Sequence, residues 1–462
     1  KVFGSLNRGS LSVSVNKRLK LIVAGRVQGV GFRPAVYSLA RSMSLRGFVL
    51  NSPSGVLIEV EGESGLLEDF IEALKKSPPE RSEIHNIEAS EIPVGDDLDF
   101  RIKSSERSGD LTVGMPPDFA TCPDCLKELF EKTDRRYRYP FINCTNCGPR
   151  FTIIDSLPYD RERTSMAGFR MCDFCSGEYH DPANRRFDAQ PVACPACGPS
   201  VEYRTVSSSS VYGEEAVGLA VKSLKEGNIL ALKGLGGYHI CCDAMNAKTV
   251  LELRRRKRRP SRALAVMFKD MDQLKKHCFV NSDEEKELTG AASPIVILKR
   301  KEDSVLPPAV SPDTNDIGAF LPYTPLHHLI LRDIGPLIMT SGNMRDEPIA
   351  RNEEEIAPML GKIADALLSH NRPILRRCDD SVLKVVEGEK LFYRRSRGYV
   401  PSTLDVSFLT RGGAMPSVLA CGAELKNTFC ITRGDKVFMS QHIGDLSDYA
   451  NYRFYQESVP DL

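Results

Sequence analysis

Apolar and polar positions alternate along the first part of the chain in the pattern of a small sheet covered by helices. Residues 19–23 (LKLIV) predict a strand, and residues 34–43 (PAVYSLARSM) have helical spacing, with the proline in the first turn, where its missing N–H costs nothing. Two strands around the turn NSPSG, an amphipathic helix at 66–76 and strand-like residues up to 102 follow. The order strand-helix-strand-strand-helix-strand predicts a ferredoxin-like domain over residues 18–104.

Residues 116–205 break this periodicity and contain four Cys-x-x-Cys pairs, separated by 18, 24 and 18 residues. Such repeated spacing is typical of two four-thiolate zinc sites, and four thiolates fill the coordination of Zn²⁺, so both sites are expected to be structural. Redox-active pairs or disulfides are the alternatives, but a redox pair is expected singly and near a βαβ pattern. The predicted ligands are Cys122, Cys125, Cys144, Cys147, Cys172, Cys175, Cys194 and Cys197.

The spacing leaves the grouping of these cysteines open. In the simplest grouping, the first two pairs bind one ion and the last two pairs bind the other, but an interleaved grouping fits as well. The segment has few core residues, so we expect its folding to depend on the metal.

Apolar strands recur between helical stretches over residues 213–403. EEAVGLAVKSLKEG predicts a helix, and NILALKG, ALAVMF, SPIVILK and GPLIMTS predict buried strands, which together indicate an α/β domain. Residues 415–462 begin another strand-turn-strand pattern, but a fold of about 100 residues or more does not fit in this remainder, so we expect a domain cut off at Leu462. The chain is therefore predicted to be a multidomain protein of mixed α+β and α/β class.

Composition limits the classes of function. A chain of 462 residues is expected to hold two to four domains, and its formal net charge of +1 argues against a dedicated nucleic-acid binder or an electrostatic membrane anchor. No apolar run approaches the roughly 20 residues of a membrane span, and the first residues lack a signal-peptide core. The cysteine pattern suits a reducing cytoplasm, where the six cysteines outside the pairs would be inert buried thiols.

Residues 26–33, RVQGVGFR, join the first predicted strand to the first predicted helix. Glycines in such a loop let successive N–H groups converge on one point, at the positive end of the following helix. Arg33 is placed to grip an anion, and Asn51 on the next strand is placed to hold a water for attack on a bound phosphoryl group. A plain glycine-rich turn with a solvent-exposed arginine is the alternative. The predicted phosphate-binding loop is Gln28, Gly29, Val30, Gly31 and Phe32.

A second candidate anion site lies in residues 213–403. Lys233 opens the sequence KGLGGYH after a buried strand, where glycines allow close approach of the backbone to an anion, and a basic run covers 254–262. Such a run is normally a solvated helix face or a nucleic-acid patch, but polar clusters at 340–343, 370–382 and 393–401 indicate a cleft for a phosphate-rich ligand. The sequence contains no GxxxxGK[ST], which excludes a P-loop ATPase.

These motifs resemble two known families. The loop together with Asn51 resembles acylphosphatase, which implies that Arg33 binds phosphate and that Asn51 orients the water. The later strings resemble the YrdC-type domain that makes carbamoyl-adenylates from ATP, except that Arg262 and Ala263 replace a lysine and a proline of the family run K-x-R-P-x-K-P-L. The predicted nucleotide-binding residues are Lys233, Lys257, Arg259, Arg262, Ser341 and Asn343.

The order of these parts, ending in ACGAELKNTF, is similar to the hydrogenase maturation carbamoyltransferase family HypF. The resemblance implies that carbamoyl phosphate is hydrolysed at the first site and that carbamate travels through a protected channel to the second. There ATP, with Mg²⁺, would convert it to carbamoyl-AMP. An ASKHA-like domain would then pass the carbamoyl group to the C-terminal cysteine of the partner HypE, for a cyanide ligand of the [NiFe] centre. Because the transfer domain is cut off, we expect hydrolysis and adenylate formation without completed transfer.

Two other classes of function remain open at this point. The basic run favours an RNA-binding or RNA-modifying protein, although the near-zero net charge does not. Paired four-cysteine zinc sites also occur in protein-binding modules, which favours a chaperone-like scaffold. Neither class explains the acylphosphatase motif.

Overall fold

In the computed structural model, the chain forms two compact units, Lys1–Val113 and Gly114–Leu462. The residues whose structure is described are 16–106, 114–344, 347–410, 416–433 and 436–461. None of the helices within these ranges is long and apolar enough to cross a membrane.

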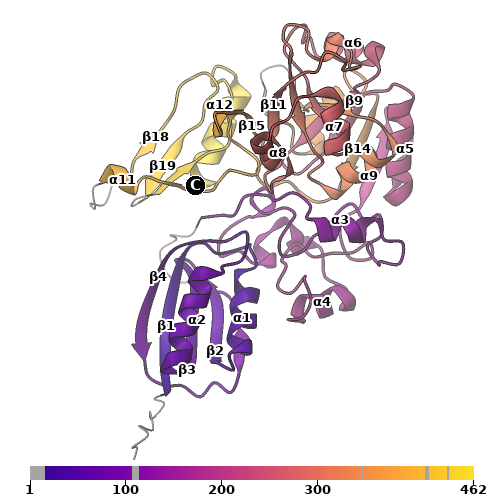
Figure 1. The fold of residues 1–462 in the computed structure, drawn as a ribbon. Helices are drawn as coiled ribbons and strands as arrows, with labels where there is room; N and C mark the ends of the chain where they lie inside the picture. Colours follow the sequence, from indigo (N-terminus) through magenta and orange to yellow (C-terminus); the bar gives the residue numbers. More distant parts are fainter. Residues whose placement is uncertain (1–15, 107–113, 345–346, 411–415, 434–435, 462) are drawn as a thin grey trace, which may run out of the picture. The chain divides into compact units, whose positions relative to one another are not determined.

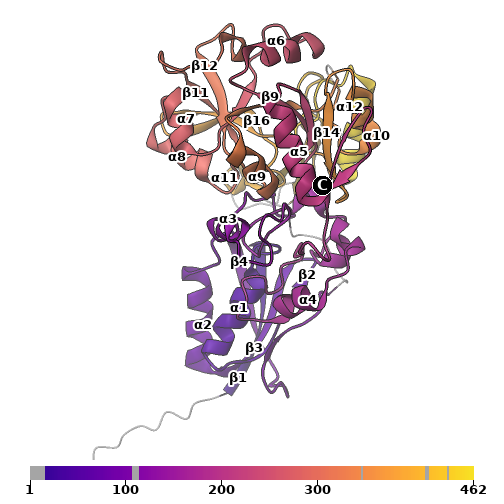
Figure 2. The same cartoon turned by 90° about the vertical axis from the view of Figure 1, so that its right-hand side faces the viewer.

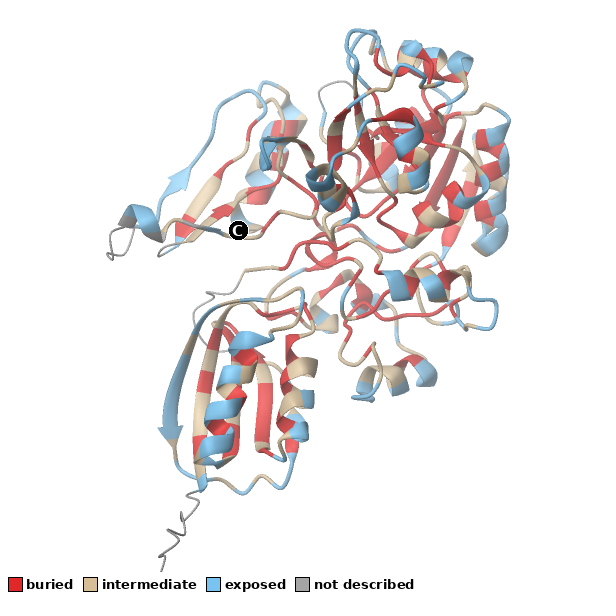
Figure 3. Cartoon of the chain, viewed as in Figure 1, coloured by how far each residue is buried: buried red, intermediate tan, exposed pale blue. Residues whose placement is uncertain are grey.

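The first unit is a sheet covered on one face by helices (Figure 1). Its elements are β1 (Asn16–Arg26), α1 (Phe32–Ser42), β2 (Arg46–Ser52), β3 (Gly55–Glu63), α2 (Ser64–Lys76), β4 (Glu83–Ile92) and β5 (Phe100–Ile102). The strand order is β4-β1-β3-β2-β5, and β5 runs parallel to β2 whereas the other neighbours are antiparallel. Leu21 and Val23 of β1 and Phe70 of α2 are fully buried, whereas β4 is largely exposed at the edge (Figure 3). The predicted ferredoxin-like order is confirmed.

The cysteine-rich segment opens the second unit and is built from short helices and turns. These are α3 (Pro123–Phe130), η1 (Phe151–Ile153), η2 (Arg161–Arg163), η3 (Ser165–Gly168) and α4 (Asp173–His180). α3 and α4 each begin directly after the first cysteine of a pair, Cys122 or Cys172. The sequence predicted little periodic structure here, because eight residues are too few to show a helical period.

A mixed sheet forms the centre of the second unit. Its strands are β6 (Val201–Thr205), β7 (Val211–Tyr212), β8 (Leu230–Lys233), β9 (Tyr238–Asp243), β10 (Ala265–Met267), β11 (Ile295–Lys299), β12 (Asp316–Phe320), β13 (Leu337–Ser341), β14 (Ala366–His370), β15 (Val382–Val386) and β16 (Glu389–Arg394). They lie in the order β16-β15-β11-β12-β10-β13-β9-β8-β14-β6-β7. Residues 201–205, at the end of the predicted cysteine-rich segment, form β6 and pair with β14.

Helices cover both faces of this sheet, as the sequence predicted for an α/β domain. They are α5 (Gly213–Lys225), α6 (Ala247–Arg256), α7 (Met271–His277), α8 (Ser282–Thr289), α9 (Pro325–Asp333) and α10 (Glu353–Ile356), with η4 (Pro308–Val310) and η5 (Ala357–Met359). α5 and α9 pack on one face together with the cysteine-rich segment, which contributes Leu129 and Phe141 to that core (Figure 2). α6, α7 and α8 pack on the other face. The cysteine-rich segment is therefore part of the core of this unit.

Residues 404–461 add a small separate sheet with one helix packed against it. Its elements are β17 (Leu404–Asp405), α11 (Ser407–Thr410), β18 (Leu419–Ala420), β19 (Cys430–Arg433), β20 (Lys436–Met439), α12 (Tyr449–Ser458) and η6 (Val459–Asp461). The strand order is β17-β20-β19-β18, and Phe454 of α12 packs with Phe429 and Ile443. An ion pair between Arg376 Nη2 and Asp461 Oδ1 (2.9 Å) connects this part to the larger sheet domain.

Candidate functional site

The loop between β1 and α1 has the backbone conformation that its glycines predict. Gly29 and Gly31 have φ angles of 69° and 76°, in the left-handed region that favours glycine. Gly31 is the N-cap of α1, so the loop ends at the positive end of that helix. Val30 and Phe32 are buried and anchor the loop in the core. The predicted phosphate-binding loop therefore presents its backbone at a helix N-terminus.

Gln28 has a supporting position in this loop. Its Nε2 donates hydrogen bonds to the carbonyl oxygens of Ser52 and Gly55, both at 2.8 Å. These bonds fix the loop to the turn between β2 and β3. The side chain of Gln28 thus orients the loop, and its amide donor is already used within the protein.

Arg33 of α1 and Asn51 of β2 each contact the segment that follows β5. In the sheet, Val56 of β3 is opposite Asn51 of β2 on one side and Val23 of β1 on the other. Asn51 therefore lies level with the end of β1, next to the β1–α1 loop. Arg33 is 7% exposed and donates from Nη1 to Ser105 Oγ (3.4 Å), while the next residue along, Glu106, donates its N–H to the Asn51 carbonyl oxygen (2.8 Å). The segment after β5 thus contacts both residues that the sequence assigned to phosphoryl chemistry.

The eight paired cysteines form two sets of four within the described residues, Cys122, Cys125, Cys144 and Cys147, and Cys172, Cys175, Cys194 and Cys197. A tetrahedral site with Zn–S bonds of about 2.3 Å has S–S edges of about 3.8 Å. The Sγ atoms of Cys122 and Cys144 lie 3.7 Å apart, and those of Cys172 and Cys194 also lie 3.7 Å apart. Both sets therefore fit zinc, and they follow the simplest grouping rather than the interleaved one.

Each set of cysteines receives hydrogen bonds from arginines of the other half of the segment. Arg135 Nη2 donates to Cys194 Sγ (3.2 Å) and Arg136 Nη2 donates to Cys175 Sγ (3.3 Å). In the opposite direction, Arg185 Nη2 donates to the Sγ atoms of Cys122 and Cys125, both at 3.2 Å. N–H donors of this kind offset thiolate charge and orient metal ligands.

Sequence reasoning missed these hydrogen bonds between the arginines of one half and the cysteines of the other, although the sequence contains a signal for them. The chain repeats the motif CxxC…RR…CxxCGP at a constant offset of 50 residues, which aligns Arg135 with Arg185. Carboxylates at the same offset hold the guanidinium groups, since Arg136 Nη1 donates to Glu178 Oε1 (2.9 Å) and Arg185 Nη1 lies 2.8 Å from Glu128 Oε1. The segment is a duplication whose halves complete one another.

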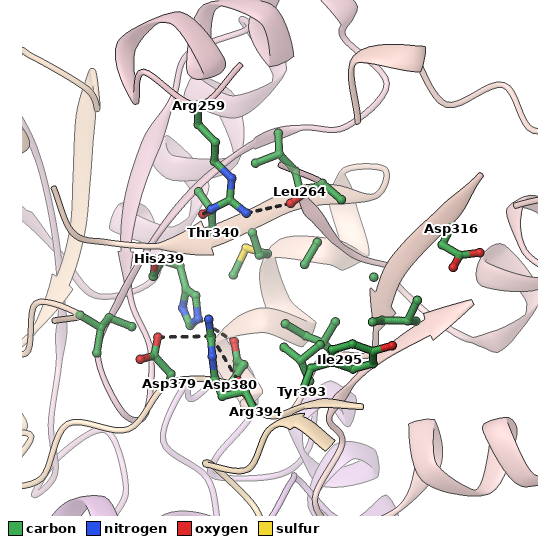
Figure 4. Close-up of a pocket in the computed structure, with 18 of the residues that line it drawn as sticks. His239, Arg259, Leu264, Ile295, Asp316, Thr340, Asp379, Asp380, Tyr393 and Arg394 are labelled. Carbon is green, nitrogen blue, oxygen red and sulfur yellow. Dashed lines mark hydrogen bonds and ion pairs between the residues drawn. The ribbon is translucent and has the colours of Figure 1, made fainter. Parts of the chain in front are cut away.

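Two neighbouring cavities form the candidate nucleotide site. The first, of about 380 Å³, has Arg259, Thr340 and His239 on its wall, with Asp379, Asp380 and Arg394 gathered near His239 (Figure 4). The second, of about 640 Å³, shares several of these residues and extends to Lys426, His442, Ile443, Gly444, Asp445 and Asn451. Five of the six predicted nucleotide residues line one or both cavities, namely Lys257, Arg259, Arg262, Ser341 and Asn343.

Lys257 is bonded directly to the Ser-x-Asn segment. Its Nζ donates to the carbonyl oxygen of Ser341 (2.6 Å) and to that of Asn343 (3.2 Å), and Ser341 Oγ donates to Asn343 Oδ1 (2.9 Å). Burial lowers the pKa of Lys257 to about 7, and the nearby charge of Arg259 adds to the effect. Two motifs that lie about 85 residues apart in sequence therefore meet at one cation.

The pKa of Arg259 is also lowered from its ordinary value. Burial lowers its pKa to about 10, and the neighbouring cations Arg262, Arg254 and Arg394 lower it further. Its Nη2 donates to the carbonyl oxygen of Ala263 (2.8 Å). Cations that converge in this way repel one another, and a bound polyphosphate would relieve the repulsion.

The basic run at 254–262 does not form a single charged face. Arg254 is buried and donates from Nη1 to the carbonyl oxygens of Arg259 (2.8 Å), Pro260 and Arg262 (both 3.1 Å), so it shapes the loop that carries the other cations. Arg255 and Arg256 pair with Glu252 on the same helix, each at 2.7 Å. This division does not match the continuous patch expected of an RNA-binding surface.

Lys233 does not line either cavity. It is buried at the end of β8, and its Nζ donates to the His370 carbonyl oxygen at 2.8 Å. In the β8–β9 register Lys233 is opposite Tyr238, so its side chain points to the sheet face opposite to that of His239. The structure does not bring this predicted nucleotide ligand to the other five.

Family models match four successive parts of the chain. Residues 19–102 match the model described as Acylphosphatase, residues 121–154 and 171–203 the HypF finger, residues 222–396 the Sua5/YciO/YrdC model described as Telomere recombination, and residues 413–462 the HypF Kae1-like domain. A stand-alone acylphosphatase of Ligilactobacillus salivarius is 41% identical over 87 residues, which cover 97% of that protein.

Longer relatives match nearly the whole chain. The carbamoyltransferase HypF of Rhodobacter capsulatus is 43% identical over 447 residues, and the probable carbamoyltransferase HypF of Methanocaldococcus jannaschii is 41% identical over 456 residues. These matches cover 96% and 98% of this chain, but only 58% and 59% of the relatives. The chain thus spans a little over half the length of these curated relatives.

Solved structures give the same result. A crystal structure of full-length HypF in a phosphate- and nucleotide-bound form superposes with a TM-score of 0.92 at 44% identity, covering 97% of this chain and 59% of that one. The structure of HypF from T. kodakarensis superposes with a TM-score of 0.89 at 42% identity, covering 96% and 57%. On sequence, domain content and fold, the chain belongs to the HypF carbamoyltransferase family.

Proposed function

We propose that this chain hydrolyses carbamoyl phosphate in its first unit and joins the resulting carbamate to AMP in its second unit. The observation that carries the proposal is the meeting of Lys257, Arg259 and Ser341 at one cavity, in a chain that also contains an acylphosphatase loop. The full-length HypF whose crystal structure contains phosphate and nucleotide supports both ligand classes.

In the first step, Arg33 and the N–H groups of residues 29–32 hold the phosphoryl group, and Asn51 orients a water molecule. The water oxygen bonds to phosphorus as the bond to the carbamoyl oxygen breaks, and carbamate leaves while phosphate remains. Positioning and charge stabilisation are sufficient for this chemistry, so no covalent intermediate on the protein is required.

In the second step, a carbamate oxygen attacks the α-phosphorus of ATP, and pyrophosphate leaves. Lys257, Arg259 and Arg262 stabilise the negative charge on the phosphates. Asp379, which lines both cavities, would offer an oxygen ligand of the kind that Mg²⁺ takes when it accompanies ATP. The four-cysteine sets would each hold a structural zinc ion, because four thiolates leave no open position for a substrate.

We further propose the domain limits 18–104, 116–205, 213–403 and 415–462, a cytoplasmic location, and a HypE-type protein as the carbamoyl acceptor. Transfer of the carbamoyl group to that acceptor is likewise a proposal, because the chain spans 58% of the length of the carbamoyltransferase HypF of Rhodobacter capsulatus.

Exchange of labelled pyrophosphate into ATP tests the proposal, using the zinc-loaded chain. We expect exchange that requires carbamoyl phosphate and is accompanied by release of phosphate. Exchange that proceeds equally well without carbamoyl phosphate, or is absent with it, would contradict the proposed function.

A further inference from the structure

The two halves of the cysteine-rich segment make the same backbone contacts to one another in both directions. Arg136 Nε donates to the carbonyl oxygen of Ala193 (2.8 Å), and Arg186 Nε donates to that of Asn143 (3.1 Å). The two donors, and likewise the two acceptors, are separated by the 50-residue offset of the repeat. Each half therefore binds the backbone directly before the last cysteine pair of the other half.

The arginines of each half lie on a loop between two cysteine pairs. We call Cys122, Cys125, Cys144 and Cys147 the first set, and Cys172, Cys175, Cys194 and Cys197 the second set. The first loop, residues 126–143, connects the pairs of the first set and carries Arg135 and Arg136. The second loop, residues 176–193, connects the pairs of the second set and carries Arg185. A metal ion held by one set ties the ends of its own loop together and so restricts the arginines on that loop.

Both loops contain the same turn. Arg138 and Asp188, which are related by the repeat, have left-handed φ angles of 56° and 58°, a conformation that is uncommon for residues other than glycine. The Arg138 N–H donates to the Leu129 carbonyl oxygen (2.8 Å), and the Asp188 N–H donates to that of Tyr179 (2.9 Å). The arginines of the two loops are therefore presented by the same backbone shape.

The donors of each loop lie against the sulfur atoms of the other set. Arg135 and Arg136 of the first loop donate to the second set, and Arg185 of the second loop donates to the first set, at N–S distances between 3.2 and 3.3 Å. Four thiolates around Zn²⁺ leave a net negative charge, which guanidinium groups offset in a partly buried place. One set therefore gains this stabilisation only while the loop of the other set is in position.

Carboxylates on the short helices hold the arginines in these positions. Arg136 Nη1 donates to Glu178 Oε1 (2.9 Å) on α4, and Glu128 on α3 pairs with Arg185 (2.8 Å) and with Arg186. α3 and α4 each begin directly after the first cysteine of a set. Each set is thus linked in sequence both to the arginines that it sends to the other half and to the carboxylate that receives an arginine from it.

We propose that the two zinc sites are thermodynamically coupled, so that zinc bound at either set strengthens the binding of zinc at the other through the arginines of the closed loop. The coupling is reciprocal, because the effect of the first site on the second equals that of the second on the first. The chain is then mostly either empty or doubly loaded. The proposal concerns the loading of the chain with metal and does not depend on the proposed reaction.

The difference in exposure between the sets makes coupled and independent binding distinguishable. The first set is buried and packs in the core with Leu129 and Phe141, whereas Cys172 and Cys197 of the second set are partly exposed. Independent sites that differ in this way lose their ions one after the other, so singly loaded protein accumulates. Two independent sites, equal or not, leave at least half of the molecules singly loaded when half of all the zinc has been removed. Coupled sites leave less than half.

Native mass spectrometry of the whole zinc-loaded chain tests this difference. The method counts molecules with no, one and two zinc ions at equilibrium with increasing amounts of a chelator. We expect the singly loaded form to stay below half of all molecules at the point where half of the zinc has been removed. A singly loaded form at or above half would overturn the proposal.

Arginine variants separate coupling through these side chains from coupling through folding alone. Arg185→Ala removes the donor to the first set and should raise the singly loaded fraction above that of the unaltered protein. Arg185→Lys, which keeps the charge but not the planar group of donors, should lie between the two. Arg170→Ala, an exposed arginine between the halves, is the matched control. A singly loaded fraction that is the same in Arg185→Ala as in the unaltered protein would overturn the proposal.

A double-mutant cycle measures the coupling at the first set. Replacing Cys172 and Cys175 with alanine should raise the Kd for zinc at the first set roughly tenfold, as measured by competition with a chelator. Adding Arg185→Ala to this variant should have little further effect, because the second loop is no longer closed. An unchanged Kd in the variant without the second set, or a full additional loss from Arg185→Ala, would overturn the proposal. Circular dichroism checks that the variants fold, and if they do not, the count of ions on the unaltered chain decides.

Discussion

The two proposed anion sites of this chain are built in opposite ways. The β1–α1 loop uses consecutive backbone groups and one arginine, and it depends on glycines with φ angles of 69° and 76°. The nucleotide cavities instead use side chains such as Lys257 and Ser341, which come from distant parts of the sequence. Backbone donors do not titrate, whereas buried lysines do, so the two sites are expected to respond differently to substitution and to pH.

The largest effect is expected at the loop. Replacing Arg33 with alanine removes its charged side-chain donor, so phosphate release from carbamoyl phosphate should fall on the order of 10³-fold, while exchange supplied with carbamate should continue. Phosphate release is measured directly. Arg41→Ala, an exposed arginine on the same helix, is the control, and similar losses in both variants would contradict a specific role for Arg33.

A smaller effect is expected from a single side chain of the nucleotide cavities, since several cations share the charge there. Lys257→Met should raise the KM for ATP by up to roughly 100-fold and leave phosphate release intact. Lys248→Met, an exposed lysine on α6, should change neither value. Loss of phosphate release in Lys257→Met would show that the two sites are not independent.

The cysteine sets show a third arrangement, in which arginine side chains donate hydrogen bonds to the sulfur atoms of the cysteines. Arg136 belongs to the first half of the duplicated segment but donates to Cys175 of the second set. Arg136→Ala should therefore weaken zinc at the second set by roughly tenfold or more, as measured by competition with a chelator. Arg185→Ala should weaken zinc at the first set. If each variant affects only the set in its own half, the cross-contacts do not stabilise the metal.

The smallest effect is a pH dependence confined to the nucleotide cavities. The pKa of Lys257 is lowered to about 7, so the lysine is charged below pH 7 and becomes neutral above it. The KM for ATP, measured with saturating magnesium, should rise roughly tenfold from pH 6 to pH 8. Lys257→Arg should remove this dependence, because arginine stays charged over the range. A flat profile in the unaltered protein would contradict the titration of Lys257.

The difference between the two anion sites also explains what sequence reasoning could find. The ferredoxin-like order, the loop and the cysteine pairs are local patterns, in which the residues that act together are close in sequence, and the fold and the cysteine sets agree with them. The Lys257–Ser341 contact could be anticipated only from a family resemblance, because nothing in either segment indicates the other.

The remaining features depend on long-range packing. Residues 201–205 join the sheet as β6 by pairing with β14, about 165 residues later in the chain. Lys233 was assigned to the nucleotide because a glycine-rich loop follows it, and its orientation is decided by the β8–β9 register.

The most direct test of a two-step reaction asks whether carbamate links the two units. Arg33→Ala protein would be assayed for pyrophosphate exchange, first with carbamoyl phosphate and then with ammonium bicarbonate as a source of carbamate. We expect no exchange in the first case and exchange close to that of the unaltered protein in the second. Normal exchange with carbamoyl phosphate, or none with ammonium bicarbonate while the unaltered protein is active, would contradict carbamate as the shared intermediate.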